Sequence, residues 1–100
     1  MMYGLTQEEL LQLKSFLDNQ PKIKQAVLYG SRVKGTNKPF SDVDIALMGE
    51  ELSQKDVKEL LSIIYDTNFP YQVDIVLFHT LKNQDLIEHI QRVGVVIYSN

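Results

Sequence analysis

Apolar runs that suit strands alternate along this chain with amphipathic segments that suit helices, and one connection departs from that alternation. Residues 31–41 join the first two predicted strands, yet they carry too little apolar periodicity for a long crossover helix. One short helix or turn fits there, so at least one pair of strands is expected to be antiparallel. We therefore predict an α/β chain of the α+β type, with a mixed four-stranded sheet and helices packed on it.

Local signals mark the individual elements. A capping box at Thr6 and Glu9 opens the first helix, Ser53 opens the second, and Asn83 and Gly94 bound the last. The predicted helices span residues 6–19, 53–66 and 83–93, and the predicted strands span residues 26–29, 43–48, 73–78 and 95–98. No repeat or low-complexity linker separates them, so we expect residues 1–100 to form a single domain.

Composition excludes several classes of protein and site. Among the 100 residues there is no cysteine and there are two histidines, which excludes disulfides and Cys-based metal sites and leaves oxygen as the main metal ligand. No apolar run approaches the ~20 residues of a membrane helix, and the N-terminus is no secretory signal, so a cytoplasmic protein without membrane contact is expected. The net charge of −3 argues against direct binding of nucleic acid.

A glycine and a serine follow the first predicted strand and open an anion-attracting segment. Where a strand turns into a short helix, free backbone N–H groups point outward; Gly30 lets phosphates approach them and Ser31 adds a donor. Residues 21–41 carry five of the ten basic residues and no acid, and Arg32 and Lys34 are placed to neutralise a triphosphate. Taken alone, Gly-Ser is more often an ordinary turn, and both cations suit a solvated surface equally well.

Three aspartates occupy strand positions where they can act together. Asp42 and Asp44 are two residues apart, so they project from one face of the second predicted strand, and Asp74 lies on the third. Two carboxylates about 5 Å apart repel by roughly 3 kcal/mol at an effective dielectric of ~20, so a cation is expected between them. Magnesium suits such oxygen ligands. Taken separately, the pair Asp42 and Asp44 and the single Asp74 could each instead be surface aspartates on a solvated strand.

A phosphate-binding turn and three carboxylates together favour in-line attack on a nucleotide phosphate, supported by two metal ions. We assign Asp42, Asp44 and Asp74 to catalysis and to the metals, and Asp74 also to the proton of the attacking hydroxyl. The predicted nucleotide-binding residues are Gly30, Ser31, Arg32, Lys34 and Ser41.

The spacing of these motifs resembles that of a known family. Gly30-Ser31, ten further residues and then Asp42-Val43-Asp44-Ile45 are similar to the Gly-Ser…Asp-x-Asp pattern of the DNA polymerase beta-like nucleotidyltransferase superfamily. The stretch GSRVKGTNKPFSDVDIAL looks like that of the minimal nucleotidyltransferases of bacteria and archaea, with the third aspartate at Asp74. The resemblance extends over essentially the whole chain and implies a polymerase beta-like core.

The resemblance also implies an activity. That activity is transfer of AMP from ATP, with magnesium and release of pyrophosphate, to a tyrosine of a small helical HEPN-domain toxin, which would make this chain the antitoxin. Larger relatives append a helical domain that helps to hold the acceptor, so we expect weak activity without a partner chain. Two alternatives stay open: a catalytically idle module that neutralises its partner by contact, and transfer to a small molecule such as an aminoglycoside.

Overall fold

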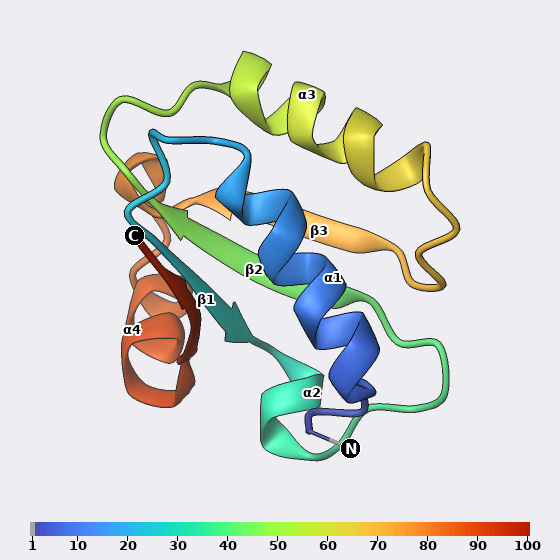
Figure 1. The fold of residues 1–100 in the computed structure, drawn as a ribbon. Helices are drawn as coiled ribbons and strands as arrows, with labels where there is room; N and C mark the ends of the chain where they lie inside the picture. The colour runs from blue at the N-terminus through green and yellow to red at the C-terminus, as the bar shows by residue number, and fades with distance from the viewer. Residues whose placement is uncertain (1) are drawn as a thin grey trace.

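The computed structural model describes residues 2–100, and its elements follow the predicted alternation (Figure 1). In chain order they are α1 (Gln7–Asp18), β1 (Gln25–Tyr29), α2 (Ser31–Lys34), β2 (Val43–Met48), α3 (Gln54–Tyr65), β3 (Val73–Leu77), the 3-10 helix η1 (Phe78–Thr80), α4 (Gln84–Val93) and β4 (Val95–Ser99). The short helix expected after the first strand is α2. Within residues 2–100, no helix is both long enough and apolar enough to cross a membrane.

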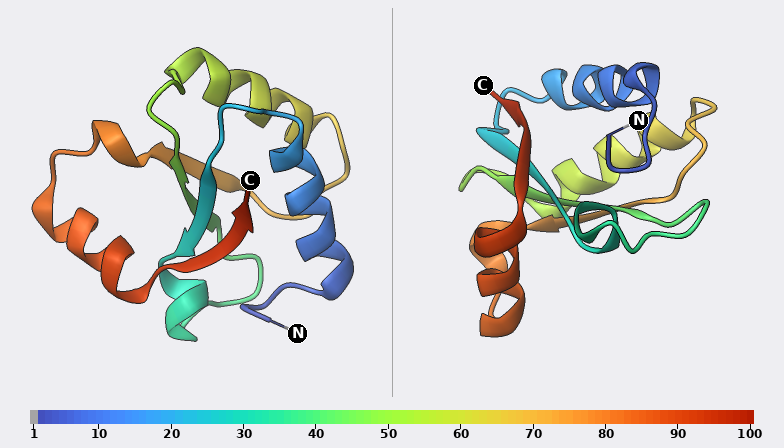
Figure 2. Two further views of the ribbon diagram at one scale, coloured as in Figure 1. Left: turned by 60° about the vertical axis from the view of Figure 1, so that its left-hand side comes forward. Right: turned by 90° about the horizontal axis from the view of Figure 1, so that it is seen from below.

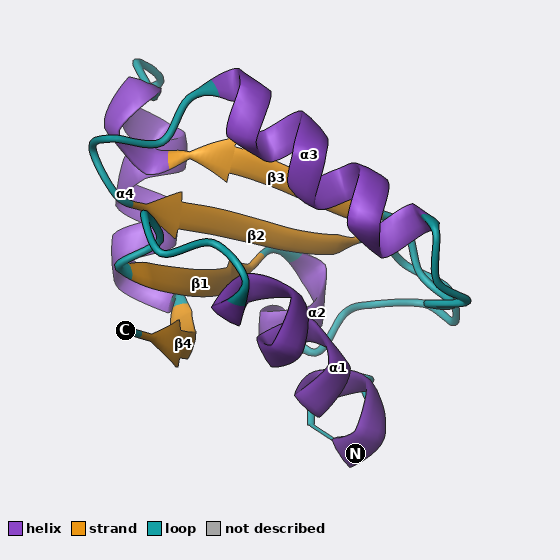
Figure 3. Cartoon of the chain, turned by 45° about the horizontal axis from the view of Figure 1, so that its top comes forward, coloured by secondary structure: helices purple, strands orange, loops and turns teal. Residues whose placement is uncertain are grey.

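The strands form one mixed sheet in the order β3-β2-β1-β4 (Figure 3). β1 pairs antiparallel with both β2 and β4, whereas β2 and β3 run parallel. The antiparallel pair of β1 and β2 confirms the prediction from the short connection, because α2 is only one helical turn long. β2 and β3 are joined through α3, which supplies the crossover that parallel neighbours require.

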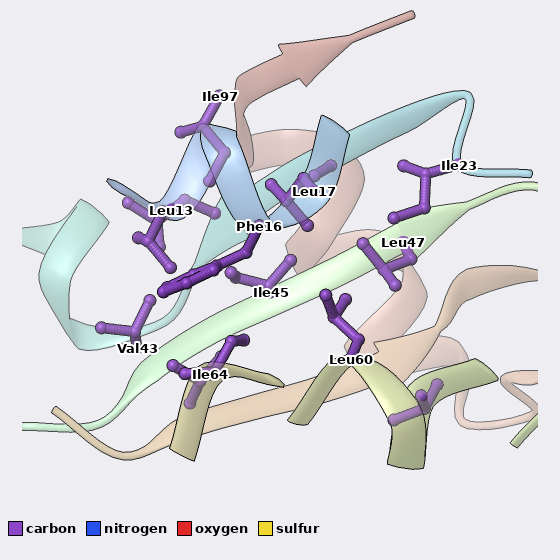
Figure 4. Packing of buried hydrophobic residues seen from close by; sticks show 14 of the residues in the cluster. Leu13, Phe16, Leu17, Ile23, Val43, Ile45, Leu47, Leu60, Ile64 and Ile97 are labelled. Atoms are coloured by element: carbon purple, nitrogen blue, oxygen red, sulfur yellow. The ribbon is translucent and has the colours of Figure 1, made fainter. Parts of the chain in front are cut away.

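One face of the sheet carries the main hydrophobic core, beneath α1 and α3 (Figures 2 and 4). The alternating residues Val43, Ile45 and Leu47 of β2 are buried there, as the two-residue period of a strand predicts. Phe16 of α1 and Leu60 of α3 pack against them from the apolar stripes of the two helices. The other face of the sheet is thereby left to α4 and to polar side chains.

α4 lies on that opposite face (Figure 2), and a smaller apolar cluster lies under it. Val27 of β1, Ala46 of β2 and Ile90 of α4 are buried in it. The cluster occupies one part of this face, and the end of the sheet nearer to α2 carries the acidic residues singled out in the sequence.

A capping box at the start of α3 gives the stability of the fold a dependence on pH. Oδ2 of Asp56 accepts hydrogen bonds from the backbone N–H (2.9 Å) and the hydroxyl (3.2 Å) of Ser53, and Lys22 Nζ lies 3.4 Å from the same oxygen. The Ser53 N–H is the main cause that lowers the pKa of Asp56 below its ordinary value, and Lys22 lowers it further. The folded chain therefore favours the ionised carboxyl.

We expect this carboxylate to stabilise the fold at neutral pH and to lose that effect in acid. A carboxylate whose pKa is lower in the folded chain stabilises it above the unfolded pKa, and the contribution disappears as the pH falls through the folded pKa. Asp56→Asn should therefore lower the urea midpoint near pH 7, and the difference from wild type should shrink as the pH falls below the ordinary aspartate pKa of about 3.9. Urea unfolding across this pH range checks this, and a difference that does not change with pH would contradict it.

Candidate active site

Side chains from three neighbouring strands form one row across the sheet. Tyr29 of β1 pairs with Asp44 of β2, and Asp44 pairs in turn with Asp74 of β3. Directly paired residues point to the same face of a sheet, and this is the face that α4 partly covers. Asp42 lies just before β2 and is exposed. Strand register thus brings Asp44 and Asp74 side by side, and Asp42 lies two residues before Asp44 in the chain.

The carboxylates of this row repel one another. Burial is the main cause that raises the pKa of Asp44, and the charges of Asp74 and Asp42 raise it further, while Arg32 acts in the opposite direction. Burial, followed by the charges of Asp44 and Asp74, raises the pKa of Tyr29 to about 12. The phenol therefore stays protonated at neutral pH, and the row presents a negative field that a cation would relieve.

The oxygen donors of this site fit a magnesium ion that a substrate also helps to hold. Across residues 2–100, no three His, Cys, Asp or Glu side chains lie close enough to one another to hold a metal by themselves. The predicted ligands Asp42, Asp44 and Asp74 are therefore electrostatic neighbours rather than a preassembled cluster of three ligands. Such a set suits magnesium, which proteins usually bind with one or two carboxylates together with substrate phosphates.

Gly30 adjoins the row and has a backbone conformation that other residues rarely adopt. Its φ of 83° and ψ of −155° lie in a region that is open essentially to glycine. A Cβ at this position would overlap Oδ2 of Asp44. The glycine therefore lets the Asp44 carboxylate lie directly against the start of α2, where the sequence predicts phosphate binding.

The other predicted nucleotide-binding residues lie on and after α2. Ser31 is partly exposed and Lys34 is exposed, so solvent reaches both at this end of the sheet. Ser41 differs, because its Oγ accepts a hydrogen bond from the Lys38 N–H (2.8 Å) and shapes the loop that leads to β2. Ser31 and Lys34 are thus open to a phosphate, whereas the hydroxyl of Ser41 has a partner within its own loop.

Arg32 is buried, which differs from the predicted contact with a triphosphate. Its side chain lies under the surface with 2% of the residue exposed, and Cζ is 4.3 Å from the centroid of the Tyr71 ring. Its guanidinium donates to three backbone oxygens, those of Tyr3 (3.0 Å), Ser41 (2.6 Å) and Asp42 (3.3 Å). Arg32 therefore positions the segment before β2 and ties it to the N-terminal segment.

Arg32→Lys should destabilise the fold although it keeps the positive charge. An ammonium group lacks the planar fork that reaches several carbonyl groups at once, and a buried acceptor that loses its partner costs about 1–3 kcal/mol. We expect the free energy of unfolding to fall by about 2 kcal/mol, measured by urea denaturation. Lys34→Ala removes an exposed cation from the same helix and should change it by less than about 0.5 kcal/mol. Equal effects of the two changes would contradict the role of Arg32.

One aromatic contact beside the row is not evident from the sequence. The polar neighbours of His89 on its helix suggest a solvated position, but the side chain is partly buried. Its ring packs edge-on against Tyr29, with centroids 6.1 Å apart and an angle of 79° between the planes. Helical periodicity places His89 beside the buried Ile90, yet only the docking of α4 on β1 brings it to Tyr29.

Comparison with protein families identifies the family of this chain. The family model described as Polymerase beta, Nucleotidyltransferase matches residues 11–100, a range that includes Gly30 and all three aspartates. The chain belongs to this nucleotidyltransferase family. The resemblance seen in the sequence is therefore confirmed, and with it the polymerase beta-like fold and the assignment to nucleotidyltransferase enzymes.

One relative of this nucleotidyltransferase is named as a protein adenylyltransferase. The probable protein adenylyltransferase MntA of Haemophilus influenzae is 35% identical over 94 residues, which cover 90% of this chain and 79% of that relative. A solved toxin–antitoxin structure with AMP-PNP matches with a TM-score of 0.73 and 25% identity, over 96% of this chain and 75% of the other.

A further solved structure shares the fold of this nucleotidyltransferase. It is the complex of a tri-AMPylated Shewanella oneidensis HEPN toxin with an MNT antitoxin, with a TM-score of 0.71 over 96% of this chain and 74% of the other. At 20% identity, this likeness is one of fold alone.

Proposed function

We propose that this chain is a magnesium-dependent protein adenylyltransferase that transfers AMP from ATP to a hydroxyl of a HEPN-domain toxin and thereby acts as its antitoxin. The observation that carries the proposal is the parallel register that pairs Asp44 with Asp74, next to the turn at Gly30. The relative named as a protein adenylyltransferase and the likeness to a toxin–antitoxin structure with AMP-PNP support it. In this proposal residues 1–100 act as one catalytic domain.

The reaction is an in-line exchange at the α-phosphorus of ATP. The oxygen of an acceptor hydroxyl, in our proposal that of a tyrosine, forms a bond to this phosphorus while the bond to the bridging oxygen of the β-phosphate breaks. AMP is then joined to the acceptor and pyrophosphate leaves. Asp74 is exposed at the end of the acidic row, where it takes the proton of the attacking hydroxyl.

The residues around the start of α2 orient the nucleotide. Free N–H groups of the first helical turn and the Ser31 hydroxyl donate to the phosphates. Asp42, Asp44 and Asp74 would hold magnesium, which when bound supplies positive charge for the phosphates and the leaving oxygen. Because Gly30 has no side chain, the Asp44 carboxylate stays close to that turn.

Transfer of label from ATP tests this function against its alternatives. The chain is incubated with magnesium, the HEPN-domain partner protein and ATP labelled at either the α- or the γ-phosphate. AMP transfer puts only the α label on the partner, because the γ label leaves in pyrophosphate. Label from neither position would indicate a module that acts by contact or a small-molecule acceptor, and γ label would indicate a kinase, so either result would overturn the proposal.

A further inference from the structure

The loop that leads into β2 carries an exposed aromatic side chain on a strained backbone. Phe40 has a φ of 66°, an outlier for a bulky residue, and it is 79% exposed. Strained conformations persist only where the surrounding structure enforces them, and they concentrate at functional sites. The backbone conformation disfavours folding and the exposed ring buries little apolar surface, so the stability of the fold does not account for a phenylalanine at position 40.

Contacts at the base of this loop hold Phe40 in place. Arg32 donates to the carbonyl oxygen of Ser41, the residue directly after Phe40, at 2.6 Å, and it also stacks on Tyr71. The Phe40 ring lies against the other member of this stack, with its centroid 6.5 Å from that of Tyr71 and an angle of 42° between the planes. These contacts fix the base of the loop, and the exposed ring projects outward from it.

This ring lies beside the proposed reaction centre. Phe40 is two residues before Asp42, and Tyr71 is three residues before Asp74. Because β2 and β3 are parallel, the segments that lead into them lie at the same end of the sheet. A protein whose hydroxyl reaches the acidic row therefore has part of its surface next to Phe40.

We propose that Phe40 is the anchor on which the acceptor protein docks, with its ring inserted into an apolar pocket of that protein. This inference rests on the proposed function. A projecting aromatic ring suits a pocket in another protein, whereas a small-molecule site such as that of a nucleobase is concave and covers most of its ligand. The exposed Lys34 and Lys38 in the same segment favour an acidic rim around that pocket.

Substitution of Phe40 separates docking from catalysis. Phe40→Asn removes the ring and introduces a residue that tolerates the left-handed conformation, so the variant should melt at or above the wild-type temperature. We expect its KM for the HEPN-domain partner to rise about 10-fold or more, and its KM for ATP to stay within about twofold. Phe40→Tyr keeps the ring and should resemble wild type. So should Val96→Thr, which alters an exposed apolar side chain on β4 at the far edge of the sheet.

Two results of this experiment would overturn the docking role. A rise in the KM for ATP alone would make Phe40 a nucleobase contact, and unchanged KM values for both substrates would leave the ring with no part in binding either. If the wild-type chain transfers no AMP, the proposed function fails, and calorimetric titration of the HEPN-domain partner without ATP then tests docking separately. In that titration, about 10-fold weaker binding of Phe40→Asn supports the anchor, and equal binding contradicts it.

Discussion

Gly30→Ala is expected to reduce AMP transfer by at least about 100-fold. The added methyl group would overlap Oδ2 of Asp44, and a residue with a Cβ rarely adopts a φ of 83°. The carboxylate must then move, and a displacement of about 1 Å at a reacting group can cost 100-fold in rate. The strain should also lower the free energy of unfolding by about 1–3 kcal/mol. Initial rates and urea denaturation measure the two effects.

Gly35→Ala is the matched control for this change. Gly35 ends α2 with a φ of 75°, so alanine meets a backbone cost there too, but no atom lies within 4 Å of the new Cβ. We expect a loss of stability of about 1 kcal/mol with transfer close to that of wild type. If both variants lose transfer equally, the space beside Asp44 is not the reason that position 30 needs glycine.

Asp44→Asn should lower the rate of AMP transfer by about 10²–10⁴-fold and leave the chain folded. The amide keeps the shape of the side chain but lacks the negative charge that a magnesium ligand needs. Burial and the charges of Asp74 and Asp42 already raise the pKa of Asp44, so the fold disfavours its ionised form and a neutral side chain relieves the repulsion. The variant should therefore melt at the wild-type temperature or above it.

Asp18→Asn provides the control for the loss of one carboxylate. Asp18 ends α1, where it accepts a hydrogen bond from the Tyr98 hydroxyl (3.0 Å), and an amide oxygen can still accept that bond. Transfer by this variant should match wild type. Comparable losses in Asp18→Asn and Asp44→Asn, or a clearly lower melting temperature for Asp44→Asn, would contradict the assigned role of Asp44.

Local signals are sufficient to predict the elements and the mixed sheet. The capping box at Thr6 predicts where a helix starts, using only residues within one turn. The spacing of Val43 and Ile45, two residues apart, predicts which face of the strand is buried. The antiparallel pair follows from residues 31–41, which are too irregular for a crossover helix. Each inference depends on residues that are close in the sequence, and the structure agrees with each.

The details of the site depend on contacts between segments, which local patterns do not encode. The pairing of Asp44 with Asp74 follows from the register of two strands separated by α3. Arg32 lies in a stretch rich in basic and polar residues, which favours a surface position, yet it is buried and donates to carbonyl groups of two other segments. The positive φ of Phe40 could not be predicted, because a bulky residue such as phenylalanine rarely adopts this conformation.

The intact mass of the HEPN-domain partner, recorded after incubation with ATP, magnesium and this chain, tests most directly whether the paired carboxylates of Asp44 and Asp74 carry out AMP transfer. We predict that the wild-type chain adds whole AMP groups to the partner, and that Asp44→Asn and Asp74→Asn add at most about a hundredth as much in the same time. A partner that keeps its original mass with the wild-type chain, or gains AMP with either variant at close to the wild-type rate, would contradict the role of this acidic pair.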